Sequence, residues 1–67
     1  MDKKEFGKKI KLARVECDFT QAQLAEKINT KQKNISRYET GSSMPSIETL
    51  SKIAQVLKKK VGYFFGE

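Results

Sequence analysis

The sequence predicts an all-α domain, and three observations lead to this prediction. Apolar residues recur at the three- and four-residue spacing of a helix face in several separate segments. Residue types that favour helix N-caps precede these segments, and types that tolerate left-handed backbone follow them. No repeat, low-complexity tract or linker divides the 67 residues, so we expect one domain over residues 6–65.

The composition favours a small, positively charged globular domain. Lys and Arg number 14 against 8 Asp and Glu, a formal net charge of +6, and 37% of the residues are apolar, which is enough for a small core. A chain this short buries only about 60% of the surface that it exposes when unfolded, so functional residues must lie on the surface. The excess of positive charge suits a polyanionic partner, with nucleic acid the first candidate.

The residue types that are missing exclude several kinds of chemistry. The chain has no histidine and one cysteine, Cys17, so it can form neither a zinc cluster, a histidine-based catalytic site nor an internal disulfide. We expect no metal, no cofactor, no small-molecule ligand and no enzymatic activity. The lysine-rich N-terminal region lacks the apolar core of a signal peptide, and no apolar run approaches the roughly 20 residues of a membrane span. We therefore expect a cytoplasmic protein without membrane contact.

The first helix is predicted to end near Asp18, a residue type that tolerates left-handed backbone. Its apolar face is formed at helical spacing by Phe6, Ile10, Ala13 and Cys17. Two interpretations remain open for the other faces: solvation or phosphate contact for Lys4, Lys8 and Lys11, and isolated surface residues or a second contact patch for Leu12 and Val15.

A second helix is predicted over residues 20–28. Thr20 and Gln23 have the spacing of a capping box, in which each side chain bonds to the backbone of the other. Asn29 is the best substitute for glycine where a turn demands positive φ, so the chain is expected to turn there. The inward residues are Leu24, Ala25 and Ile28.

A third helix is predicted over residues 31–40, with Thr30 as its N-cap and Gly41 as its stop signal. Pro45 marks the loop that follows, and Ser46 caps a fourth helix. The inward residues of the third helix are Ile35, Tyr38 and Glu39, and those of the fourth are Ile47, Leu50, Ile53, Ala54 and Leu57.

The last element is a short aromatic segment over residues 61–65, which follows a run of three lysines. Three adjacent aromatic side chains cannot all face inward on one short helix. Tyr63, Phe64 and Phe65 therefore either close the core or form an oligomer surface, and at least one of them is expected to meet a partner.

The second and third helices, joined by a short turn, have the plan of a helix-turn-helix, whose second helix enters the DNA major groove. Residues 20–28 (TQAQLAEKI), 35–41 (ISRYETG), 45–46 (PS) and 50–57 (LSKIAQVL) together resemble the lambdoid phage repressor, Cro-like and xenobiotic-response-element (XRE) family in order and spacing. The resemblance covers nearly the whole chain. It implies a compact five-helix, lambda-repressor-like DNA-binding domain with its helix-turn-helix at residues 20–40.

The resemblance also implies roles for individual residues. Gln21 is expected to contact the DNA backbone and brace the recognition helix, and Arg14 to form an ion pair with Glu39, since burying Arg14 without a partner would be costly. Lys58 stands where the family usually has glycine. Gln suits adenine, and Lys or Arg suits guanine. The expected DNA-contacting set is Gln21, Lys31, Gln32, Lys33, Asn34, Arg37, Ser42 and Ser43.

These observations predict a sequence-specific transcriptional regulator, a repressor that binds double-stranded DNA at a palindromic operator and associates with the nucleoid. One such module buries only about 600–1,000 Å² on DNA, and two copies about 34 Å apart multiply the contacts, so a homodimer is expected. Its interface is assigned to residues 63–65. The alternative is an antitoxin-like or adaptor domain that binds a protein, with DNA contact secondary, and salt-sensitive binding to duplex DNA discriminates the two.

Overall fold

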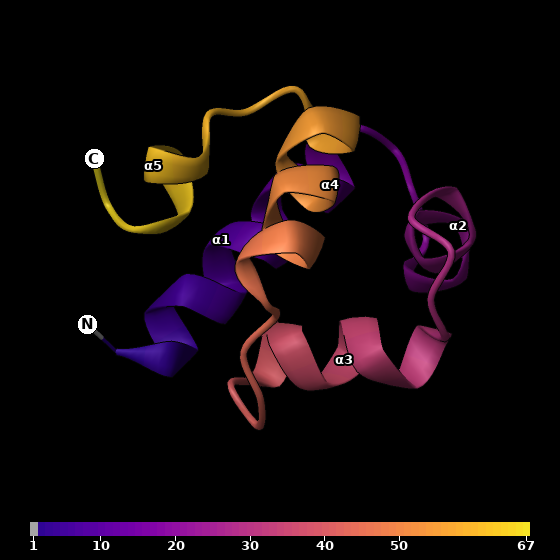
Figure 1. Ribbon diagram of the computed structural model, residues 1–67, viewed down its shortest axis with the longest axis horizontal. Helices are drawn as coiled ribbons and strands as arrows, with labels where there is room; N and C mark the ends of the chain where they lie inside the picture. The colour runs from indigo at the N-terminus through magenta and orange to yellow at the C-terminus, as the bar shows by residue number, and fades with distance from the viewer. Residues whose placement is uncertain (1) are drawn as a thin grey trace.

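Five helices make up the fold in the computed structural model, which describes residues 2–67. In Figure 1 α4 crosses in front of α1 at the centre of the view, α2 and α3 form one side, and α5 packs on α1 near its N-terminal half. The predicted all-α, five-helix architecture is confirmed. The helices are α1 (Lys3–Glu16), α2 (Gln21–Lys27), α3 (Gln32–Thr40), α4 (Ile47–Leu57) and α5 (Val61–Phe64).

Side-chain caps define where three of the helices begin. The Thr20 hydroxyl accepts a hydrogen bond from the backbone N–H of Gln23 at 3.0 Å, and the Gln23 side chain accepts one from the backbone N–H of Thr20 at 2.8 Å, so the predicted capping box is present. Ser46 caps α4 by accepting from the N–H of Thr49 at 3.1 Å, as expected. Asp2 caps α1. These bonds satisfy backbone donors that have no partner inside the helix.

Left-handed residues mark the ends of four helices, α1 to α4. Asp18 and Asn29 adopt φ values of +60° and +59°, and Gly41 adopts +84°, each at the position where the sequence predicted a helix end or turn. Lys58 ends α4 with φ +60°, at the position where the resembling family usually has glycine. A side chain with a Cβ is strained there, so the turn after α4 forms in spite of its residue type.

The predicted N-cap of α3 is wrong by one residue. Lys31 occupies the cap position and makes no capping hydrogen bond with its side chain. Thr30 lies one residue too early to reach the backbone donors of the first turn, and its hydroxyl instead accepts from the side-chain amide of Asn34 at 2.9 Å. The backbone N–H of Thr30 donates to the carbonyl of Ala25 at 2.8 Å. Thr30 therefore stabilises the turn between α2 and α3.

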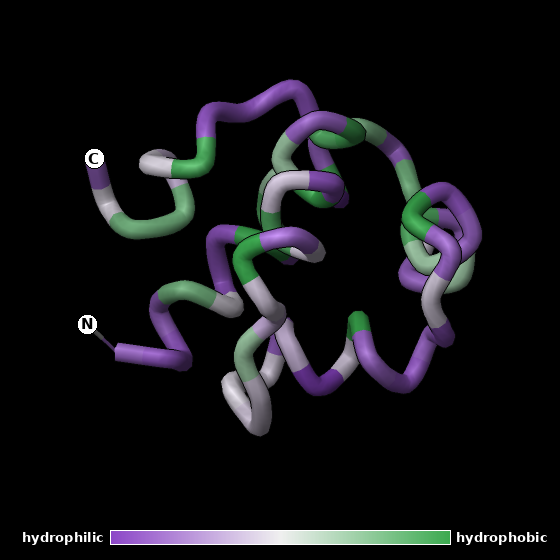
Figure 2. The backbone as a smooth tube through the Cα atoms, viewed as in Figure 1, coloured by the Kyte–Doolittle hydropathy of each residue, from purple (hydrophilic) through white to green (hydrophobic). Residues whose placement is uncertain are grey.

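The core collects apolar side chains from all five helices. The hydropathy colouring in Figure 2 shows hydrophobic segments of α1, α3 and α4 turned toward one another, with hydrophilic segments on the outside. One expected core residue is exposed: Ile47, at 72%, lies at the first residue of α4, and the buried face of that helix begins one turn later. The largest fully buried side chains are Phe6, Ile10, Leu24, Ile35, Leu50, Ile53, Leu57 and Phe64.

Gly7 sets the distance between α1 and α3, which pack directly against each other. A Cβ built on Gly7 would lie 2.5 Å from the backbone oxygens of both Tyr38 and Glu39, closer than such atoms approach. The obstacle is backbone and not the flexible end of a side chain. α1 can therefore reach α3 at this point only because residue 7 lacks a side chain.

We expect Gly7→Ala to destabilise the domain by about 1–3 kcal/mol, the usual range for overpacking, even though alanine favours helix by about 1 kcal/mol. Gly62→Ala is the matched control, because a Cβ there meets the side chain of the terminal residue Glu67, which can move aside. Urea unfolding followed by circular dichroism measures both variants. Equal midpoints for Gly7→Ala and the parent would show that the contact between α1 and α3 is not tight.

Candidate nucleic-acid interface

The helix-turn-helix occupies one side of the molecule. In Figure 1 α2 is seen nearly end-on while α3 lies across the view, so the two helices cross steeply. They pack against each other, and α3 also packs on α1. α3 has nine residues and is therefore about 13 Å long. Its outer face follows the edge of the molecule, free of the other helices, where a DNA groove can receive it.

The two faces of α3 differ sharply in burial and charge. Ile35 is fully buried, Tyr38 is half-buried, and Glu39, the only acidic residue between 31 and 40, is 8% exposed. The exposed residues are therefore cationic or neutral. In α3 and its N-cap they are Lys31, Gln32, Lys33, Arg37 and Thr40. The cationic residues among them and the N-terminal end of the helix dipole give this face a positive potential.

A buried ion pair fixes α3 to α1. The Nε atom of Arg14 donates to Oε2 of Glu39 at 2.6 Å, and a second guanidinium nitrogen donates to Oε1 at 3.2 Å. A third donates to the backbone carbonyl of Phe19 at 2.7 Å, just before α2. The two side chains are 10% and 3% exposed. The pair implied by the family resemblance is thus present, and it joins α1, the entry to α2 and α3.

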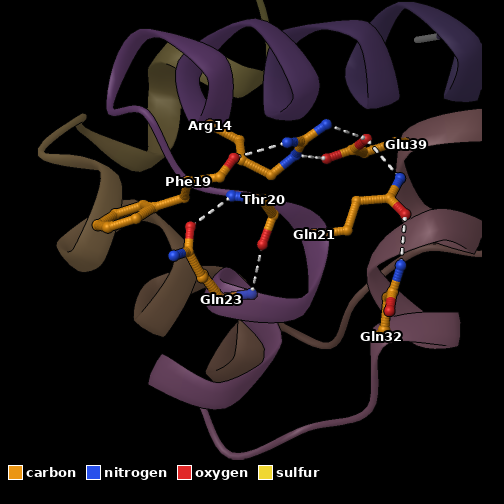
Figure 3. A network of polar contacts seen from close by, with 7 residues as sticks. All are labelled: Arg14, Phe19, Thr20, Gln21, Gln23, Gln32 and Glu39. Carbon is orange, nitrogen blue, oxygen red and sulfur yellow. Dashed lines mark hydrogen bonds and ion pairs between the residues drawn. The ribbon is translucent and has the colours of Figure 1, made fainter.

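The same carboxylate also holds Gln21, the first residue of α2. The side-chain amide nitrogen of Gln21 donates to Oε1 of Glu39 at 3.0 Å. Its amide oxygen accepts from the side-chain nitrogen of Gln32 at 3.4 Å. Figure 3 shows the resulting chain of polar contacts, which runs from Arg14 in the interior to Gln32 at the exposed start of α3. Gln21 is therefore braced against α3.

The remaining expected contact residues fall into two groups. Asn34 is half-buried, and its amide donates to Thr30, so it faces the turn between α2 and α3. Ser42 and Ser43 follow the C-terminal end of α3, where their backbone N–H groups donate to the carbonyl of Arg37 at 2.9 and 3.3 Å. They thus lie at the opposite end of α3 from Gln32 and do not form one cluster with it.

The aromatic end of the chain differs from the expected dimer surface. Phe64 is fully buried against Phe6, so it belongs to the core, because the short α5 turns this side chain toward α1. Tyr63 is half-buried, and two lysine ammonium groups lie over its ring, those of Lys59 at 4.7 Å and Lys9 at 5.1 Å from the centroid. Phe65 is 41% exposed. Of the three expected interface residues, only Phe65 and the edge of Tyr63 face solvent.

One part of the site was not predicted from the sequence. The family resemblance implied only Arg14 as the partner of Glu39, whereas the Glu39 carboxylate also accepts a hydrogen bond from Gln21. A carboxylate has about four lone-pair positions, so one bidentate partner does not exhaust it. The sequence therefore indicates that Glu39 can accept a further hydrogen bond. It does not indicate which residue donates it, because Gln21 lies 18 positions away along the chain.

The described residues also contain no helix long and apolar enough to cross a membrane. Within residues 2–67 no group of three or more potential metal-binding side chains comes together. The features that the described residues bring together at the site are hydrogen bonds, one ion pair and exposed positive charge.

This arrangement defines a helix-turn-helix domain of the kind that transcriptional regulators use to bind DNA. A helix-turn-helix family model matches residues 10–64, which is most of the chain, and the chain belongs to this family. Over 61 residues it is 34% identical to the HTH-type transcriptional regulator ImmR of Bacillus subtilis, covering 91% of this chain and 48% of ImmR. The helix-turn-helix match agrees with the family resemblance drawn from the sequence.

The chain is also similar to another protein sequence and to a solved structure. The chain is 40% identical over 57 residues to multiprotein-bridging factor 1a of Arabidopsis thaliana, covering 85% of this chain and 40% of that protein. The structure of Bacillus thuringiensis PlcR in complex with the peptide PapR7 and DNA superimposes with a TM-score of 0.85 and 37% identity, over 92% of this chain and 22% of PlcR. The chain thus spans about half or less of the length of these relatives.

We expect Glu39→Ala to cost about 3–5 kcal/mol of stability, because it leaves the buried Arg14 guanidinium without its counter-ion. Glu26→Ala removes the same charge from an exposed position of α2 and is expected to change stability by no more than about 0.5 kcal/mol. Chemical denaturation of both variants and the parent measures the difference. Coincident midpoints for Glu39→Ala and Glu26→Ala would contradict a structural role for the pair.

Proposed function

We propose that this chain is the DNA-binding domain of a sequence-specific transcriptional regulator, a repressor that inserts α3 into the major groove of a palindromic operator. The observation that carries the proposal is the outer face of α3, which is exposed, cationic and braced from behind by Gln21 and the buried ion pair. A rigid recognition helix loses little freedom on binding, so more of its contact energy appears as affinity.

The exposed residues divide by position into readers and anchors. Gln32 and Lys33 lie in the first turn of α3, the end that points into the groove in this motif, and their side chains are long enough to reach base edges. Lys31 precedes the helix, and Ser42 and Ser43 follow it, so they suit phosphates on either side of the groove. Arg37 lies one turn beyond Lys33 and can serve either role. Asn34 acts indirectly, by holding the turn through Thr30.

The proposal includes a homodimer on DNA. One module makes too few contacts for high specificity, and two copies on one face of the duplex double them. The exposed part of the C-terminal aromatic segment, Phe65 with the edge of Tyr63, is one surface for this contact. Leu12 and Val15 are a second, since both lie on the outer face of α1 and are 58% and 53% exposed.

A second candidate function is an adaptor that binds another protein. The observation that favours it is the 40% identity to multiprotein-bridging factor 1a, a protein whose name describes bridging between proteins. In that case Leu12 and Val15 are the surface for the partner, and the cationic face of α3 contributes non-specific DNA affinity only. The two functions differ in how strongly the chain prefers one DNA sequence over another.

We expect affinity for duplex DNA to fall steeply with salt, with a log–log slope of about −0.9 for each phosphate contacted, because binding releases condensed counterions. Fluorescence anisotropy with labelled duplexes, selected first from a random pool, measures the slope. Comparison of a palindrome with its half-site in the same titration gives the number of chains bound, and two chains on the palindrome support the dimer. Affinity that does not change between low and physiological salt would contradict DNA binding, and equal affinity for all sequences would favour the adaptor.

We expect Gln32→Ala and Lys33→Ala each to cost about 1–3 kcal/mol on the selected operator and little on random DNA, because a base contact is lost. Lys31→Ala is the control: loss of a phosphate contact weakens binding to both DNAs by a similar factor and reduces the salt slope by about one. Affinities for operator and scrambled duplexes at one salt concentration measure the ratio. An operator-to-random ratio that neither Gln32→Ala nor Lys33→Ala changes would show that the first turn of α3 does not read bases.

A further inference from the structure

We infer that the buried carboxylate of Glu39 fixes the donor–acceptor direction of the Gln21 and Gln32 side-chain amides and thereby determines which base Gln32 selects. The inference rests on the proposed function, because it concerns the same recognition helix. It assigns to Glu39, which lies in the interior and out of reach of DNA, the role of a specificity-determining positioning residue.

The ion pair between Arg14 and Glu39 sets the first donor–acceptor orientation. A carboxylate can only accept hydrogen bonds, and both oxygens of Glu39 already accept from Arg14, at 2.6 and 3.2 Å. A side chain that bonds to Oε1 must therefore present a donor. Gln21 does so with its amide nitrogen at 3.0 Å. If the Gln21 amide were turned around, its oxygen would face the carboxylate oxygen, and both acceptors would lack a hydrogen. The charge of Glu39 thus excludes one of the two orientations of Gln21.

The orientation of the Gln21 amide then sets the orientation of the exposed Gln32 amide. With its nitrogen on Glu39, Gln21 presents its oxygen to α3, where it accepts from the amide nitrogen of Gln32 at 3.4 Å. Gln32 is exposed and belongs to the first turn of α3. Its orientation leaves one N–H and the amide oxygen for an outside partner, the donor and acceptor pair that matches N7 and the N6 amino group of adenine. The carboxylate of Glu39 thus orients the amide of Gln21, and the amide of Gln21 orients that of Gln32.

Glu39→Gln is expected to reverse this direction. The short contact to Nε of Arg14 requires an oxygen, so the new amide nitrogen takes the place of Oε1 and gives up only the longer 3.2 Å contact. Gln21 must then present its oxygen to residue 39 and its nitrogen to α3. Gln32 turns in response, and a donor faces the place where the adenine amino group lies. The oxygen of Gln32 then faces the N7 position, where adenine and guanine both present an acceptor, so neither purine fits. Thymine, which has a carbonyl at the amino position and a methyl group in place of N7, fits better.

The experiment compares binding to operators that carry each of the four base pairs at every position of the half-site. Gln32→Ala first identifies the position that Gln32 reads. At that position we expect the parent to prefer adenine and Glu39→Gln to lose this preference by about tenfold or more, the discrimination supplied by one bidentate contact. Preferences at the other positions stay unchanged. Glu26→Gln makes the same chemical and charge change at an exposed position of α2 and is expected to keep the parent's preferences.

A compensating double variant distinguishes a reversed amide orientation from a general loss of DNA binding. In the double variant Glu39→Gln with Gln21→Glu, the new carboxylate at 21 accepts from residue 39 on one side and from Gln32 on the other, so Gln32 returns to its original orientation. The added negative charge near the phosphates lowers affinity for every DNA, whereas the preference for adenine is restored. Restored preference with lower affinity supports the inference. A folded Glu39→Gln that keeps the parent's preference, or a folded double variant that does not recover it, overturns it.

Neutron diffraction from crystals of the free parent protein tests the amide directions without DNA or substitutions, and it can still overturn the inference if Glu39→Gln does not fold. We expect the amide deuterons of Gln21 to point at Glu39 and those of Gln32 to point at Gln21. The opposite orientation of either amide overturns the inference. A chain that binds no duplex would contradict the proposed function instead, and the neutron map would still report the amide directions separately.

Discussion

The pair between Arg14 and Glu39 is the interaction on which the rest of the helix-turn-helix depends. A guanidinium offers five donors in a fixed plane, and three nitrogens of Arg14 are used at once, two on the Glu39 carboxylate and one on the Phe19 carbonyl. The three contacts reach α1, the chain entering α2, and α3. Both side chains are nearly buried, so separating them would leave each charge desolvated and without its partner. The relative placement of the three helices is therefore set by one planar group.

Close backbone packing acts together with this charge pair. Gly7 allows α1 to approach the C-terminal half of α3, and Arg14 binds Glu39 two turns further along α1. Both contacts meet α3 at Tyr38 and Glu39, on the face turned toward α1, so the opposite face remains available for binding. The buried acid also removes the only negative charge of residues 31–40 from the surface, so the same ion pair that orients α3 leaves its outer face uniformly basic or neutral.

A second set of basic residues lies away from this face and has a different role. Lys59 lies over the ring of Tyr63 and also forms an ion pair with Glu16 at 3.4 Å, while Lys9 lies over the same ring from α1. Cations over an aromatic face are attracted to its π electrons. These lysines therefore hold α5 against α1, and they cover part of the aromatic surface of Tyr63. Net charge by itself does not distinguish lysines that bind a partner from lysines that pack.

The sequence by itself determined the local structure and the family. Capping residues such as Thr20 and Ser46, left-handed positions such as Asn29, and the apolar spacing of α1 and α4 act over a few residues, so the helices and most of their ends could be predicted. Only the tertiary structure decided which aromatic of residues 63–65 is buried, that Ile47 is exposed, and that Gly7 permits a backbone contact with residues 38 and 39. It also joined Gln21 to Glu39 and Gln32. Each of these depends on groups far apart in the chain that meet only after packing, and periodicity along one helix carries no information about what lies opposite it.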